Sequence, residues 1–133
     1  MDARELSETM LQAWKARDWD AIRDLLHPDY VYTGPEGERV VGVDEGLAAG
    51  WSSFADSFPD GDYSIQGVHV DGESVVTEFR FTGIHGGDFE GIAPTGKSVE
   101  IDFCNVMHLR DGKVIAERDY LETHGLLEQL GAT

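Results

Sequence analysis

The first half of the chain carries apolar residues at helical intervals. Near the N-terminus, Leu6, Met10 and Trp14 recur every four residues, so they share one face of a helix. Further along, Trp51 and Phe54 continue a similar apolar stripe. The pattern predicts three helices, over residues 3–17, 19–26 and 44–58. A brief strand is predicted between the second and third, over residues 30–33.

The second half is different in kind, because β-branched and aromatic residues alternate with turn signals. It predicts four strands, over residues 63–70, 74–82, 98–109 and 114–121. Short Asp-Gly turns join the first pair and the last pair, and strands joined in this way are antiparallel. Helices followed by such strands predict an α+β fold in which a curved sheet covers the helices and leaves a cavity at its mouth. Residues 1–133 fit a single domain.

The negative net charge of the chain limits the kinds of molecule that we expect it to bind. The chain has 26 acidic and 10 basic residues, a formal net charge of −16. Such a field repels phosphate backbones and anionic headgroups, so we expect neither nucleic acid nor a membrane as a partner. No stretch of about 18 apolar residues predicts a membrane span, and a single cysteine, Cys104, excludes an intrachain disulfide. The simplest setting is the reducing cytoplasm. The five histidines lack the spacing of a metal site.

Three segments carry a resemblance to a known family: residues 82–97, which contain Gly-x-His-x-Gly and Pro-Thr-Gly-Lys, then residues 111–117 and 125–131. Together they resemble the SnoaL-like polyketide cyclases, members of the nuclear-transport-factor-2-like superfamily. The resemblance covers nearly the whole chain. It implies a cone-shaped half-barrel, a cystatin-like α+β roll whose antiparallel sheet wraps around the N-terminal helices. It also implies a homodimer built on the outer sheet face and no metal or organic cofactor.

The resemblance further implies general acid–base catalysis in a hydrophobic pocket. The expected reaction is an intramolecular aldol cyclisation, or an isomerisation, of a small hydrophobic or aromatic carbonyl compound. In the family, an aspartate on the last strand and a histidine on the preceding strand act through an enolate. The matching positions here are Glu122 and His108, with glutamate in place of aspartate. An apolar cavity lets a carboxylate exchange a proton near neutral pH, because desolvation favours its protonated form.

Whether Glu122 and His108 face one cavity depends on the turn between their strands. A two-residue loop pairs Leu109 with Val114 and separates the two side chains. A three-residue loop with a bulge pairs Leu109 with Lys113 and brings them to the same face. We expect the second register, in which the opposite, apolar face of these strands packs against a partner subunit. That apolar face carries Ile101, Phe103, Met107, Leu109, Ile115 and Leu121.

Seven further side chains are candidates for contact with a substrate: His85, Arg118, Tyr120, Trp14, Trp51, Phe54 and Asp102. His85 lies in a glycine-rich connection and either closes the pocket mouth or forms a turn. Arg118 either neutralises an acidic substrate or pairs with a neighbouring carboxylate such as Asp102 or Glu122. The three aromatic residues belong either to the core or to the walls around a flat ligand.

Two other functions remain open at this level. One is a non-catalytic ligand-binding or accessory protein that has the pocket without the chemistry. The other is an epoxide-hydrolase-like enzyme, since Asp102 can stand for one aspartate of the Asp-Arg-Asp set of that branch of the superfamily. Residue 100 is a glutamate where that set has its arginine, which weakens the hydrolase interpretation.

Overall fold

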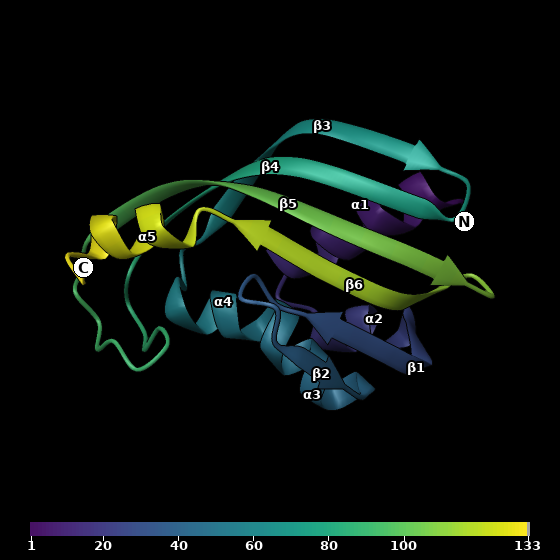
Figure 1. Ribbon diagram of the computed structural model, residues 1–133, viewed down its shortest axis with the longest axis horizontal. Coiled ribbons are helices and arrows are strands. Elements are labelled where there is room, and N and C mark those ends of the chain that lie inside the picture. Colours follow the sequence, from purple (N-terminus) through teal and green to yellow (C-terminus); the bar gives the residue numbers. More distant parts are fainter. Residues whose placement is uncertain (133) are drawn as a thin grey trace.

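A six-stranded sheet in the order β2-β1-β6-β5-β4-β3 curves over the N-terminal helices (Figure 1). The computed structural model describes residues 1–132. The helical elements are α1 (Ala3–Lys15), α2 (Trp19–Asp24), α3 (Val43–Leu47), the π-helical turn η1 (Ala48–Ser52), α4 (Ser53–Ser57) and α5 (Thr123–Leu130). The strands are β1 (Leu26–Thr33), β2 (Arg39–Val41), β3 (Asp62–Asp71), β4 (Ser74–Ile84), β5 (Ser98–Arg110) and β6 (Lys113–Leu121). The predicted α+β class is confirmed, and the sheet is open rather than closed into a barrel.

The meander from β3 to β6 is antiparallel, as expected, but the sheet as a whole is mixed. Strand β1 pairs with β6 in parallel, with Tyr32 opposite Glu117. Residues 34–112 lie between these strands, which leaves ample chain for a parallel connection. The three-residue strand β2 was not predicted, because it is too short to show an alternating pattern. Helix α2 also ends earlier than predicted, at Asp24, and Pro28 lies within β1.

The predicted third helix is present as three consecutive segments, α3, η1 and α4. Two glycines one turn apart, Gly46 and Gly50, face strand β1. A Cβ atom on Gly50 would lie 2.7 Å from the ring of Tyr32, and one on Gly46 would overlap the ring of Tyr30. The absence of side chains at these two positions therefore lets the helix lie directly on both tyrosine rings.

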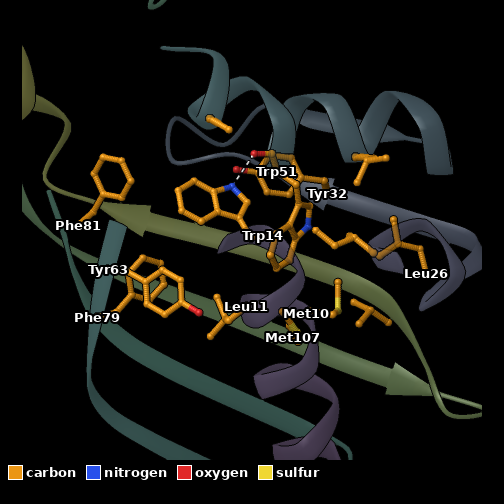
Figure 2. Packing of buried hydrophobic residues seen from close by; sticks show 14 of the residues in the cluster. Met10, Leu11, Trp14, Leu26, Tyr32, Trp51, Tyr63, Phe79, Phe81 and Met107 are labelled. Carbon is orange, nitrogen blue, oxygen red and sulfur yellow. Dashed lines mark hydrogen bonds between the residues drawn. The ribbon is translucent and has the colours of Figure 1, made fainter. Parts of the chain in front are cut away.

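The core lies between α1 and the concave face of the sheet. Figure 2 shows Met10, Leu11 and Trp14 of α1 next to sheet residues such as Phe79 and Met107, all of them buried. Each large apolar side chain of this kind contributes about 1.5–3 kcal/mol to folding by leaving water. None of the helices in residues 1–132 has the length and apolar character needed to cross a membrane.

Candidate active site

A cavity of about 1250 Å³ lies between the concave face of the sheet and the helices. Its walls are largely aromatic: Trp14, Tyr32, Trp51, Phe54, Tyr63, Phe79, Phe81, Phe89 and Phe103. Trp14, Trp51 and Phe54, for which the sequence left core and cavity wall as alternatives, all line the cavity. Figure 2 shows Trp14 and Trp51 side by side. The indole Nε1 of Trp14 donates a 3.0 Å hydrogen bond to the carbonyl oxygen of Trp51, which fixes two walls relative to each other. Such walls suit a flat apolar ligand.

The concave face of the sheet contributes three polar side chains to the deep part of this lining: Asn105 from β5, and Glu117 and Asp119 from β6. Only 3% of Glu117 and 4% of Asp119 is exposed. The two carboxylates are two residues apart on one strand, so both point to the concave face. Asn105 is directly opposite Asp119 in the β5–β6 ladder. The lining thus places two carboxylates and one amide together.

Glu117 accepts three hydrogen bonds. The hydroxyl of Tyr30 and the indole Nε1 of Trp51 donate to its Oε1, at 2.6 and 2.9 Å. Asn105 Nδ2 donates to its Oε2 at 2.6 Å. Since an aromatic side chain or an amide holds each oxygen, the carboxylate has a fixed orientation.

Asp119 accepts two hydrogen bonds. The hydroxyl of Tyr32 donates to its Oδ2 at 2.7 Å, and Asn105 Nδ2 donates to its Oδ1 at 2.9 Å. The same amide nitrogen therefore connects Asp119 with Glu117. Because each carboxylate oxygen can accept two hydrogen bonds and here accepts one, Asp119 keeps acceptor capacity for a substrate in the cavity.

The local backbone sets the positions of the three aromatic donors, Tyr30, Tyr32 and Trp51. Tyr30 and Tyr32 are two residues apart on β1, so both rings point under the helix that contains Gly46 and Gly50. Trp51 belongs to the π-helical turn η1, which widens the helix at this point. The parallel β1–β6 pairing brings these donors to the carboxylates.

Burial raises the pKa values of both carboxyl groups. Desolvation and then the charge of Asp119 raise the pKa of Glu117 to about 8, and desolvation raises the pKa of Asp119 to about 6. Desolvation and the neighbouring carboxylates also raise the pKa values of Tyr30 and Tyr32, so both phenols stay protonated donors. The pair can therefore take or release a proton near neutral pH.

The charge of the cavity lining is one-sided. Five carboxylates line it besides the buried pair: Glu36, Glu38, Asp56, Asp88 and Glu90. His124 is the one basic residue of this lining, which contains neither lysine nor arginine. A ligand with a free carboxylate or phosphate would meet repulsion here. In residues 1–132 no group of three or more His, Cys, Asp or Glu side chains is placed to hold a metal ion.

The structure does not bring Glu122 and His108 into this cavity. The expected pairing of Leu109 with Lys113 is wrong, because Leu109 pairs with Val114 across a two-residue turn. A bulge follows immediately, since His108 pairs with Ala116. His108 and Glu122 consequently do share a face, but it is the outer, convex one, where both are exposed. His108 bonds to Ser74 at 2.8 Å instead.

Three substrate-contact candidates lie on the same outer face. Asp102 is exposed and pairs with Arg80 at 3.1 Å, while 48% of Tyr120 is exposed. Arg118 lies over the ring of Tyr120, with its guanidinium carbon 4.6 Å from the ring centroid. None of the three lines the large cavity. The expected assignment of faces was inverted, because the apolar residues of β5 pack against the helices and not against a partner.

His85 is fully buried in the glycine-rich connection but does not line the cavity. Its Nδ1 accepts a hydrogen bond from the backbone N–H of Thr95 at 3.1 Å. Its backbone N–H donates to the carbonyl oxygen of Lys97, and its own carbonyl accepts from the N–H of Gly96. Of the two alternatives for His85, the structure supports the turn-forming one.

Comparison with known proteins agrees with this geometry. Residues 4–130 match the family of SnoaL-like polyketide cyclases. The chain belongs to this family. Aklanonic acid methyl ester cyclase AcmA of Streptomyces galilaeus is 25% identical over 128 residues, which are 92% of this chain and 85% of that protein. Nogalonic acid methyl ester cyclase of Streptomyces nogalater is 24% identical over 135 residues and covers 92% of each chain. A SnoaL-like protein from Jannaschia sp. CCS1 superposes with a TM-score of 0.87 at 26% identity, over 98% of this chain and 94% of that one.

The polar residues of this SnoaL-like site did leave a signal in the sequence. Glu117 and Asp119 alternate with exposed or half-buried residues on β6 and fall on the same face as the apolar Leu121. Asn105 likewise lies between Phe103 and Met107 on the apolar side of β5. Charged side chains are rarely buried without a specific role. Carboxylates in phase with the apolar residues of a strand therefore indicate a site better than carboxylates at the end of one.

Proposed function

We propose that this SnoaL-like chain catalyses an intramolecular aldol cyclisation, or a related isomerisation, of an aromatic carbonyl compound, with Asp119 as the group that takes and returns the proton. The observation that carries the proposal is the buried Asp119 carboxylate in an aromatic cavity, oriented by Tyr32 and Asn105. It also lies on the last strand, where the resemblance implies the catalytic aspartate.

The proposed reaction is balanced without an added reactant. Asp119 removes a proton from the carbon next to a carbonyl group, and the substrate becomes an enolate. The enolate carbon then attacks a second carbonyl carbon of the same molecule and forms a carbon–carbon bond. The resulting alkoxide takes the proton back from Asp119, so that substrate and product are isomers. Positioned proton transfer of this kind contributes about 10²–10⁴-fold to a rate.

The lining supports a substrate class as well as a reaction. Aromatic walls favour a planar, largely apolar molecule, and the surplus of carboxylates disfavours one with a free acid group. The two relatives are named for methyl esters, in which the acid is masked. We therefore propose a neutral aromatic polyketide ester as the substrate class.

The test uses the two compounds that name the relatives, aklanonic acid methyl ester and nogalonic acid methyl ester. Each is incubated with the protein in D₂O, and deuterium uptake and ring closure are followed by mass spectrometry. We expect Asp119→Asn to lower both rates by about 10³-fold, while quenching of Trp14 and Trp51 fluorescence shows that the ligand still binds. The matched control is Glu122→Gln on the outer face, which should leave both rates unchanged.

Two results would overturn the proposal. If the wild-type protein binds the esters but gives neither deuterium uptake nor product, it is a binding protein. If Glu122→Gln abolishes turnover while Asp119→Asn does not, the proton carrier lies outside the cavity.

We also propose a homodimer built on the outer sheet face, as the resemblance implies. Support comes from the partly apolar centre of that face, where Cys104, Val106 and Ala116 are only half-buried and Tyr120 is exposed. Light scattering after size exclusion should give twice the chain mass of 14.7 kDa. Val106→Arg should then reduce it to the monomer mass. A wild-type monomer at micromolar concentration would contradict the proposal.

A further inference from the structure

The role of Glu117 is not explained by proton transfer at Asp119 alone. A single nitrogen, Asn105 Nδ2, lies 2.6 Å from an oxygen of Glu117 and 2.9 Å from an oxygen of Asp119. Both carboxyl groups are thus within hydrogen-bond distance of one amide, and both are almost fully buried. Two carboxylates this close in a dry site cannot both ionise without strong repulsion.

The surroundings supply donors but no positive charge. In residues 1–132 neither carboxylate has a salt bridge, and Arg118, which lies between them in sequence, points to the outer face. The carboxylate of Glu38, which raises the pKa of Tyr32, adds negative charge to the same wall. The groups that face the pair from β1, η1 and β5 are all neutral donors: Tyr30, Tyr32, Trp51 and Asn105.

We propose that Glu117 is a positioning residue that shares one proton with Asp119 across the neutral pH range, so that the pair carries a single negative charge when substrate binds. Asn105 keeps the two groups at the distance that makes them interact. The proton belongs to the pair, and its two titration steps are those of a coupled site.

This proposal rests on the function proposed above and gives Glu117 a definite part in it. An enolate develops negative charge next to the carboxyl groups. With one shared proton the site presents one charge, and with none it presents two, which would oppose the enolate. The working form is therefore the singly protonated pair. Activity should rise with pH through the first titration step and fall through the second.

The charge coupling can be tested without any substrate. Carbon-13 NMR of side-chain carboxyl carbons is recorded from pH 4 to 10 for the wild type, Glu117→Gln and Asp119→Asn. We expect two separated steps shared by the pair in the wild type. Each variant should retain a single step, at least about one pH unit below the upper wild-type step. If Glu117 keeps the upper step unchanged in Asp119→Asn, the two groups titrate independently and the proposal is wrong.

The functional part is tested by the pH dependence of turnover with the ester substrates. Glu117→Gln is neutral at every pH, so its activity should persist at alkaline pH, where the wild type has declined about tenfold. A purely structural role would lower activity at all pH values and leave the alkaline limb in place, which would refute the assignment. If the wild type shows no turnover, the function proposed above fails, while the NMR titration still decides whether the proton is shared.

One further variant separates a loss of stability from a loss of the shared proton. Glu117→Leu leaves Tyr30 and Trp51 without their acceptor, whereas Glu117→Gln keeps an oxygen for both. Shared-proton coupling predicts that the two variants lose the upper titration step of the pair alike, even if only Glu117→Leu is less stable. Retention of that step in Glu117→Leu would overturn the proposal.

Discussion

The two faces of strands β5 and β6 have nearly opposite relations between chemistry and burial. The outer face carries many ionisable groups, among them His108, Glu122 and Asp102, and all three are exposed. The inner face carries only Glu117 and Asp119, yet these are the groups that the structure withholds from water. The number of polar groups on a face of the sheet therefore says little about their reactivity. What counts is the environment, since desolvation moves a carboxyl group into the neutral range.

The largest difference between the two faces is expected for neighbouring residues of β5 that point in opposite directions, Asn105 inward and Cys104 outward. Asn105→Leu removes the donor to both carboxylates, and we expect turnover of the ester substrates to fall by about 100-fold. Cys104→Ala on the outer face should leave turnover within about twofold. Similar losses from both substitutions would show that the faces do not differ. Circular dichroism and thermal melts of each variant exclude unfolding as the cause.

The next largest effect is on the pH dependence of stability. The raised pKa values of Glu117 and Asp119 mean that the folded state keeps protons that the unfolded state releases. Their contribution to stability is therefore intact below about pH 4, the ordinary range of carboxyl groups, and is lost as pH rises toward 8. Urea unfolding of the wild type and of Glu117→Gln/Asp119→Asn should show the difference in free energy moving by about 2 kcal/mol in favour of the variant between pH 5 and 8. A pH-independent difference would contradict the burial of charge.

A smaller effect is expected where the helical segments α3 and η1 lie against the rings of Tyr30 and Tyr32. Gly50→Ala places a methyl group against the ring of Tyr32, so we expect a loss of about 1–3 kcal/mol in the free energy of unfolding. Turnover should fall as well, because Tyr32 orients Asp119. Gly125→Ala in α5 is the matched control, since its nearest atoms lie at 3.5 Å or beyond. Equal stability of Gly50→Ala and the wild type would mean that the close approach does not constrain the tyrosine.

The smallest effects belong to the outer face. His108→Asn and Glu122→Gln alter exposed groups, and we expect changes below about 0.5 kcal/mol in stability and no change in turnover. Chemical denaturation and the deuterium-uptake assay measure both quantities. A loss of activity in either variant would show that the substituted residue takes part in the reaction.

The sequence was sufficient for the fold class, the helical face of Trp14 and the antiparallel meander, because each depends on local periodicity. It left open whether Trp51 and Phe54 belong to the core or to the cavity walls, and the structure places both in the lining. It failed at the final hairpin, where a two-residue turn with Asp111 and Gly112 both at positive φ is followed by a bulge. The bulge keeps His108 and Glu122 on one face, as expected, but the apolar residues of β5 pack against the helices and make the opposite face the inner one. The polar end of the strand was therefore mistaken for the cavity side.

The parallel contact between β1 and β6 could not be predicted for a different reason. No local sequence pattern indicates that the hydroxyls of Tyr30 and Tyr32 donate hydrogen bonds to carboxylates 87 residues further along the chain. The long connection between β1 and β6 consists of β2, the helical segments α3, η1 and α4, and strands β3, β4 and β5. Residues this far apart meet only through the tertiary fold, and their polar character then becomes meaningful.

The pairing of β1 with β6 also has a consequence for the order of folding. Closing a loop of this length costs entropy before the contact returns any stabilisation, so we expect β1 and β6 to join late in folding. A nascent chain that ends before β6 contains most of the aromatic wall residues but lacks the two buried carboxylates, Glu117 and Asp119. We therefore expect partly folded chains to form an apolar pocket that still lacks its buried ionisable groups.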